Sequence, residues 1–150
     1  MTSVVGLACR PSAVVGASAL GAFALRDRPD DAVAFAVSAP LALVVCDVLK
    51  RLEPEHRPRL FDRHPEQSFP SSHSACVAAF ALTAAGRNGA WWALPLAAGV
   101  VFAINAQRVL HREHWPHDVI VGDLIGIGCA VAGAAIGRFV RRRRATLRSR

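Results

Sequence analysis

The residues best suited to chemistry lie in one short stretch, 107–122, which reads QRVLHREHWPHDVIVG. Pro116 predicts the start of a helix, since a proline costs no hydrogen bond in a first turn, with His114 just before it and Asp118 inside it. A carboxylate in this place can hold one imidazole nitrogen, which leaves the other free to attack or to coordinate. Arg108 adds a planar cation that suits an oxyanion. The stretch also fits an interfacial loop, where Arg, His and Trp are common at a membrane surface.

The rest of the chain has the composition of a membrane protein. Hydrophobic residues make up 53% of its 150 residues and occur in long blocks, with the charged residues between these blocks. The formal net charge is +7, which in a soluble protein would suggest nucleic acid as the partner. Here the cations are divided between loops and an RRRR run at 141–144, as in a cytoplasmic tail that contacts anionic lipid. We therefore expect membrane lipids, and no nucleic acid, as partners.

The apolar blocks predict an all-α fold, an integral membrane bundle of about five transmembrane helices. The blocks cover residues 11–25, 32–49, 69–86, 90–105 and 119–137. The first block is short for a span, and residues 4–9 would lengthen it. We expect a single domain over 1–140, followed by a basic tail at 141–150. The four cysteines lie singly in apolar segments and predict neither a zinc site nor disulfides.

The last apolar block also contains polar and small residues that predict contacts inside the bundle. Gly122 and Gly126 are four positions apart, as are Gly133 and Gly137, a spacing that permits close approach of another helix. Asp123 lies inside the same block, where an ionisable residue could be functional, although we favour a polar contact inside the bundle.

Threading the chain through a bilayer brings distant polar segments to one face. The loop at 50–68, the helix start at 71–73 and the loop at 108–117 share a side if the third and fourth blocks both span. The loop at 26–31, the turn at 86–89 and the C-terminal tail then lie on the other side. The arginines of that side predict that it is cytoplasmic, so the first face would be extracytoplasmic.

The residues that meet on the first face suit a phosphate group. Lys50, Arg57 and Arg108 supply fixed cations, and a helix that begins at Ser71 and Ser72 supplies N–H groups. Two histidines beside such an anion could share a covalent displacement, in which one attacks phosphorus and the other protonates the departing oxygen. The sequence shows no carboxylate cluster of the kind that binds magnesium, so we expect the cations to stabilise the charge without a metal or another cofactor.

These clusters resemble the three-part signature of the type 2 phosphatidic acid phosphatase superfamily, which includes the vanadium haloperoxidases. The resemblance covers roughly residues 50–126 and implies the acid phosphatase/vanadium haloperoxidase-like helical core. In chain order, the matches are Lys50 through Arg57-Pro58 for K-x6-R-P, Pro70-Ser71-Ser72-His73 for P-S-G-H, and Gln107-Arg108, His114 and Asp118 for S-R-x5-H-x3-D.

The resemblance implies a role for each matched residue. His114 would be the nucleophile that forms a phosphohistidine, and Asp118 would orient it. His73 would protonate the leaving alcohol and later activate water. The phosphoryl oxygens would be held by Lys50, Arg57, Ser71, Ser72 and Arg108. Ser72 replaces the glycine of the signature and Gln107 replaces the serine before the arginine, changes that bear on substrate fit more than on chemistry.

The activity implied is that of a membrane lipid phosphatase, a hydrolase of phosphoric monoesters or diphosphates, in a bacterial plasma membrane. The candidate substrates are phosphatidic acid, phosphatidylglycerol phosphate, a polyprenyl diphosphate and decaprenylphosphoryl phosphoribose, and the sequence does not rank them. One alternative is a metallohydrolase that uses His111, His114 and His117 beside Asp118, although Pro116 argues against one helix carrying all three histidines. Others are a non-enzymatic anion-binding or structural membrane protein, and a haloperoxidase, which the apolar blocks and the small size disfavour.

Overall fold

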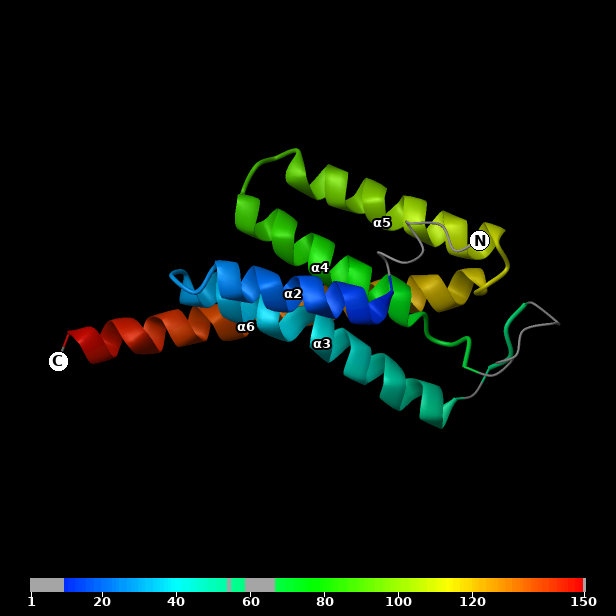
Figure 1. The fold of residues 1–150 in the computed structure, drawn as a ribbon, viewed down its shortest axis with the longest axis horizontal. Helices are drawn as coiled ribbons and strands as arrows, with labels where there is room; N and C mark the ends of the chain where they lie inside the picture. The colour runs from blue at the N-terminus through cyan, green and yellow to red at the C-terminus, as the bar shows by residue number, and fades with distance from the viewer. Residues whose placement is uncertain (1–9, 54, 59–66, 150) are drawn as a thin grey trace.

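The computed structural model describes residues 10–53, 55–58 and 67–149, and that part of the chain folds into a bundle of helices (Figure 1). The helices are α2 (Pro11–Ala24), α3 (Pro29–Leu52), α4 (Ser72–Asn88), α5 (Ala93–Leu110) and α6 (Pro116–Arg148). Three of them, α3, α5 and α6, are long and apolar enough to cross a membrane, and α2 is a shorter apolar helix. The described residues contain no strand, and the predicted all-α membrane bundle is confirmed. Residues 4–9, expected to lengthen the first helix, lie outside the described residues.

Prolines, a serine and a glycine set the ends of these helices. Pro11, Pro29 and Pro116 each begin a helix, where the missing N–H is not needed for an intrahelical bond. Ser71 caps α4, because its side chain accepts a hydrogen bond of 3.3 Å from a backbone N–H of the first turn. Gly89 ends α4 with a φ of 67°, a left-handed conformation that glycine adopts without strain.

The last helix is longer than the apolar block that predicted it. The block ends at residue 137, whereas α6 continues to Arg148 and includes the RRRR run. Arginine, which supplies six of the eleven residues 138–148, is among the strong helix formers. The basic segment is therefore continuous with the last membrane helix.

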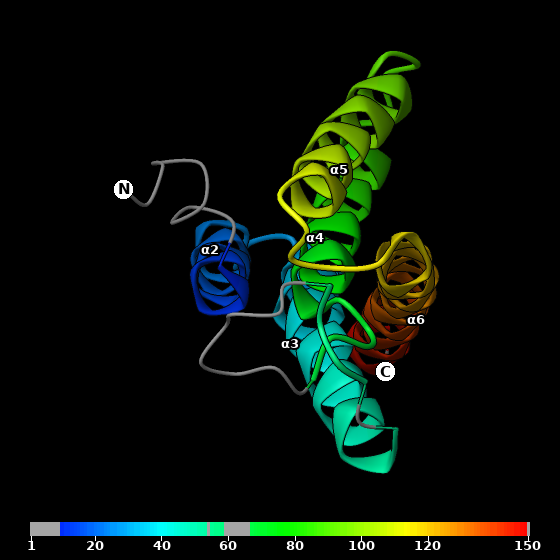
Figure 2. The same cartoon turned by 90° about the vertical axis from the view of Figure 1, so that its right-hand side faces the viewer.

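Small residues let the helices at the centre of the bundle approach closely. α3 packs against both α4 and α6, α4 packs against α6, and α2 and α5 lie outside them (Figure 2). The predicted glycine contacts are confirmed: a Cβ on Gly126 would stand 2.4 Å from the Ala75 carbonyl oxygen of α4, and one on Gly133 would stand 3.0 Å from the Ala34 carbonyl oxygen of α3. Such close packing holds helices together where lipid supplies no hydrophobic driving force between them.

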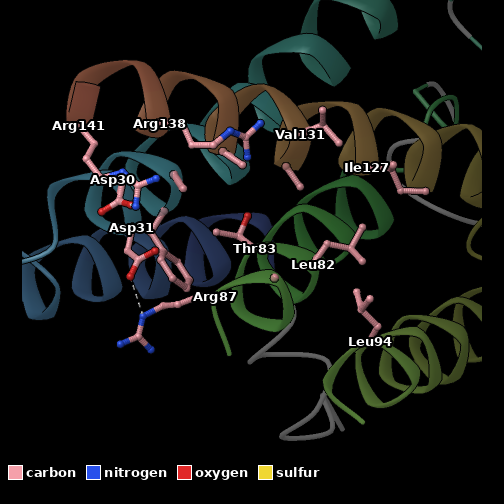
Figure 3. Close-up of a pocket in the computed structure, with 15 residues that line it drawn as sticks. Asp30, Asp31, Leu82, Thr83, Arg87, Leu94, Ile127, Val131, Arg138 and Arg141 are labelled. Atoms are coloured by element: carbon pink, nitrogen blue, oxygen red, sulfur yellow. Dashed lines mark hydrogen bonds and ion pairs between the residues drawn. The ribbon is translucent and has the colours of Figure 1, made fainter. Parts of the chain in front are cut away.

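The two ends of the bundle have different polar groups. At one end of the bundle lie the last turns of α3 and α5 and the first turns of α4 and α6. These segments and the loops next to them carry the three predicted motifs. At the other end, Nε of Arg87 in the last turn of α4 lies 3.2 Å from Asp31 in the first turn of α3 (Figure 3). The bundle therefore separates the predicted site from a second charged region at its opposite end.

Candidate active site

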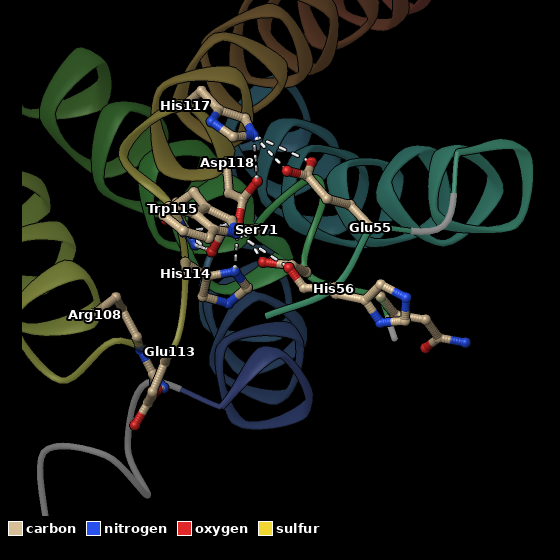
Figure 4. Close-up of polar contacts among 12 residues, drawn as sticks. Glu55, His56, Ser71, Arg108, Glu113, His114, Trp115, His117 and Asp118 are labelled. Carbon is tan, nitrogen blue, oxygen red and sulfur yellow. Dashed lines mark hydrogen bonds and ion pairs between the residues drawn. The ribbon is translucent and has the colours of Figure 1, made fainter. Parts of the chain in front are cut away.

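His114 and Asp118 are buried together where the chain enters α6. The His114 side chain is 3% exposed and Asp118 is fully inaccessible. Nδ1 of His114 lies 3.4 Å from Oδ2 of Asp118 (Figure 4). Because Pro116 begins the helix between them, the residue before the helix and the carboxylate in its first turn come to face each other. With Nδ1 against the carboxylate, Nε2 is the nitrogen left for a reaction.

Asp118 is fixed by hydrogen bonds from the residue just before α6 and from the segment that leads into α4. Its Oδ2 accepts a hydrogen bond of 2.9 Å from the Trp115 backbone N–H and another from the Ser68 hydroxyl. Its backbone carbonyl accepts a hydrogen bond of 3.0 Å from the Ser71 N–H, which ties the start of α6 to the start of α4. Ser68 was not among the predicted site residues, because it belongs to none of the motifs and no local spacing links it to a carboxylate 50 positions later.

The predicted cations gather around His73, which lies in the first turn of α4 and is partly buried. The pKa of His73 is lowered to about 3, first by burial and then by the nearby charges of Arg108, His114, Arg57 and Lys50. They come from the end of α5, the segment before α6, the loop after α3 and the last turn of α3. The fold thus brings the three motifs to one end of the bundle, as their threading through a bilayer predicted.

The arginines of this end retain donors that the protein does not use. Nε of Arg57 and Nε of Arg108 are buried and have no hydrogen-bond partner among the residues described. By contrast, Nζ of Lys50 donates a hydrogen bond of 2.7 Å to the Gln67 carbonyl, and NH1 of Arg108 pairs with Glu113. Buried donors without partners are costly, and an anion bound between them would remove that cost.

The two serines predicted to bind phosphate lie at the start of α4, where the N–H and hydroxyl of Ser71 already bond to Asp118 and Ser74. Ser71 and Ser72 are both buried, and Ser71 is the N-cap. The N–H groups of a first helical turn have no intrahelical partner, and the helix dipole favours an anion near them. Gly122 of α6 lies against this turn, since a Cβ there would stand 2.6 Å from the Ser71 carbonyl oxygen. Glycine at this position therefore lets α6 come close enough to place Asp118 beside the turn.

The loop that carries Arg57 is fastened to the start of α6. Nε2 of His117 lies 3.1 Å from the Glu55 carboxylate and 3.2 Å from Oδ1 of Asp118. The Trp115 indole N–H donates a hydrogen bond of 3.1 Å to the backbone carbonyl of His56 (Figure 4). The contacts of His117 with Glu55 and of Trp115 with His56 join residues about 60 positions apart, so no local pattern in the sequence predicts them.

Within the described chain, one group of side chains has the spacing of a metal site. Glu55, His117 and Asp118 each place one ligand atom within 4.8 Å of the others. This group includes neither His111 nor His114, so the structure does not assemble the three histidines of the metallohydrolase alternative. The contact between His117 and Glu55 already explains why these groups lie together.

Comparisons with known proteins agree with this arrangement. The family model of the PAP2 superfamily matches residues 12–142. Decaprenylphosphoryl-5-phosphoribose phosphatase of Mycobacterium tuberculosis, in strains CDC 1551 and H37Rv, is 34% identical over 134 residues, which cover 83% of this chain and 73% of the relative. The crystal structure of Aquifex aeolicus LpxE shares the fold with a TM-score of 0.65 and 22% identity, covering 82% of this chain and 84% of that one. The chain belongs to the PAP2 superfamily, as its three motifs predicted.

Proposed function

We propose that this chain is a membrane lipid phosphatase that passes the phosphoryl group of its substrate through His114 to water. Two findings support the activity. The chain belongs to the PAP2 superfamily, and it is similar to decaprenylphosphoryl-5-phosphoribose phosphatase, an enzyme named for a lipid-linked sugar phosphate. The observation that carries the mechanism is the buried contact of 3.4 Å between His114 and Asp118, beside the cations that surround His73. A nucleophile held by a carboxylate, next to an anion site, is the arrangement that covalent phosphoryl transfer requires.

The proposed reaction has two steps. Nε2 of His114 attacks the phosphorus atom, the bond to the lipid oxygen breaks, and that oxygen takes a proton from His73. Burial and the neighbouring cations lower the pKa of His73, and the negative charge of the bound phosphate raises it again, so that the imidazole carries the proton it donates. Asp118 keeps the proton on Nδ1 in place and stabilises the positive charge of the phosphorylated imidazole. In the second step His73 accepts a proton from a water molecule, which attacks the phosphohistidine and releases inorganic phosphate.

The charge of the transferring group would be stabilised by fixed donors. Lys50, Arg57 and Arg108 supply three cations, and the first turn of α4 supplies N–H groups. The unpartnered Nε atoms of the two arginines support this role, because they are already buried at the place where the anion would bind. Donors that need no rearrangement during the reaction are the most effective source of transition-state stabilisation.

The similarity to the relative from Mycobacterium tuberculosis supports one order of the candidate substrates. That protein is a decaprenylphosphoryl-5-phosphoribose phosphatase by name, and it is similar to this chain over most of the length of both. We therefore place a polyprenyl-linked sugar phosphate of this type first. Phosphatidic acid, phosphatidylglycerol phosphate and a polyprenyl diphosphate follow as substrates to be compared with it.

The site is proposed to face the extracytoplasmic side of a bacterial plasma membrane. Arg87, Arg138 and the run at 141–144 belong to the opposite end of the bundle, where the C-terminus also lies (Figure 1). Arginines next to membrane spans favour the cytoplasmic side. The C-terminal helix end would then be cytoplasmic and the phosphatase site would receive lipid from the outer leaflet.

Phosphate release from a panel of lipid phosphates tests both the activity and the mechanism. Detergent-purified protein is expected to hydrolyse at least one member, and His114→Ala should lower turnover at least roughly a thousandfold. His111→Ala is the matched control, because His111 lies exposed in the same segment. Acid-labile labelling from a phosphate-labelled substrate should occur in the wild type and be lost in His114→Ala. No release from any lipid would contradict the activity, whereas normal turnover of His114→Ala would contradict only the mechanism.

A further inference from the structure

A cavity of about 440 Å³ lies at the end of the bundle opposite the candidate active site (Figure 3). It is bounded by the first turns of α3, the last turns of α4, the start of α5 and residues 127–141 of α6. The residues of the phosphatase site occupy the other ends of these same helices. A molecule bound in this cavity would therefore not contact the phosphoryl group in the candidate active site.

One part of the cavity is apolar and open to the surroundings of the bundle. Leu82, Leu94, Ile127 and Val131 line this part (Figure 3). Leu94 is 54% exposed, Ile127 43% and Val131 62%. Because Ile127 and Val131 lie in a helix that spans the membrane, hydrocarbon rather than water covers this surface.

The other part of the cavity is basic. Arg87 pairs with Asp31 through Nε and Arg141 pairs with Asp30 through NH1, each at 3.2 Å. Each pair uses a single guanidinium nitrogen, so the remaining N–H groups of both arginines are available. Arg138 lines the same region and makes no side-chain hydrogen bond or ion pair with any residue that the structure describes. Three arginines against two aspartates leave this part of the cavity positively charged.

We propose that this cavity binds one anionic glycerophospholipid, with its phosphate on Arg138 and one acyl chain along the apolar wall. Arginine presents paired N–H groups that match phosphate oxygens, and basic pockets between membrane helices are known to hold anionic headgroups on the cytoplasmic side. The apolar wall begins beside the arginines and runs toward the middle of α6, as a lipid tail attached to a bound headgroup would. The complementarity of charge and the continuity with hydrocarbon together favour a phospholipid over a protein or a free anion.

Lipid binding by the purified full chain tests this proposal without depending on catalysis. The chain is delipidated in a neutral detergent, and its affinity for phosphatidylglycerol and for phosphatidylcholine is measured by native mass spectrometry and by thermal unfolding. We expect one phosphatidylglycerol molecule per chain to be retained more strongly than phosphatidylcholine. Arg138→Gln should weaken that binding about fivefold, as expected for one arginine at an anionic headgroup.

Two further variants test the two halves of the site. Val131→Trp should fill the apolar wall and displace the lipid, whereas Ile136→Trp, an exposed position of α6 outside the cavity, should not. Arg144→Gln removes the same charge as Arg138→Gln from an exposed position on the same helix and should leave binding unchanged. Unchanged binding in Arg138→Gln or Val131→Trp, or an equal loss of binding in the two control variants, would overturn the proposal. Normal phosphatase turnover in all four variants is compatible with it, because the two sites lie at opposite ends.

Discussion

The Asn105 side-chain amide donates a hydrogen bond of 2.6 Å to the Asp123 carboxylate, and this bond joins α5 to α6. Asn105 lies one turn before Arg108, and Asp123 lies just over one turn after Asp118. The pair therefore links α5, which carries the predicted phosphate-binding residue Arg108, to α6, which carries Asp118, the carboxylate that contacts the proposed nucleophile His114. A polar contact inside the bundle was the role that the sequence predicted for Asp123, since an unpaired acid in a membrane helix is costly.

Replacing Asn105 by Leu should lower both stability and turnover. The change leaves the Asp123 carboxylate without its partner from α5, and the free energy of unfolding should fall by about 1 kcal/mol, typical of a polar contact between membrane helices. Thermal unfolding in detergent measures the loss. In a double-mutant cycle with Asp123→Leu, the two replacements should together cost less than the sum of their separate effects. Strict additivity would mean that the pair does not connect the helices energetically.

Ser68→Ala should slow the proposed reaction without changing substrate affinity. The Ser68 hydroxyl donates a hydrogen bond to the same Asp118 oxygen that faces His114. Without this hydroxyl, the Asp118 carboxylate is positioned less firmly and orients the His114 imidazole less well. A hydrogen bond to a charged group is worth roughly 1.5–3 kcal/mol, so kcat should fall about tenfold or more while KM stays the same. Ser38→Ala is the control, because Ser38 is buried and hydrogen-bonded in the middle of α3, away from the site. An equal loss of kcat in both variants would point to general destabilisation instead.

The sequence predicted the elements of this protein better than the contacts between them. Apolar blocks predicted the helices, and the His114–Asp118 contact followed from the proline between them, because both depend on residues close together in the chain. The hydrogen bond from Ser68 and the contact between Glu55 and His117 depend on how a loop folds over the start of α6. No periodicity or spacing encodes such a fold-back, so these residues emerge only from the structure.

Glu113→Gln should strengthen the binding of phosphate-like anions. In the structure the Glu113 carboxylate occupies NH1 of Arg108, one of the donors proposed to bind the phosphoryl group. Neutralising this carboxylate removes a competitor for the guanidinium, so vanadate should inhibit the variant at several-fold lower concentration than the wild type. Glu53→Gln, an exposed acid at the end of α3, controls for the change in net charge. Unchanged vanadate inhibition in Glu113→Gln would show that the carboxylate does not compete with the anion.

Removal of divalent metal should leave phosphate release unaffected. The proposed mechanism relies on Lys50, Arg57 and Arg108 for charge stabilisation and on His114 for the attack, so no step requires a metal ion. Turnover is measured after dialysis against a chelator and again after adding zinc or magnesium. Loss of activity on dialysis that a metal restores would instead favour the group formed by Glu55, His117 and Asp118 as a metal site.

Gly126→Ala should disturb the site from a distance by separating two helices. A Cβ at this position would stand 2.4 Å from the Ala75 carbonyl oxygen and 2.7 Å from the Ala78 Cβ, so α6 must move away from α4. Overpacking of this kind typically costs about 1–3 kcal/mol of stability. Because the Ser71 N–H reaches the Asp118 carbonyl across the same helix pair, turnover should fall together with the unfolding temperature. Gly128→Ala adds the same methyl group where nothing lies within 4 Å, and because alanine is the better helix former it should lower neither quantity. Equal losses in the two replacements would show that the close approach of α4 and α6 does not require the glycine at position 126.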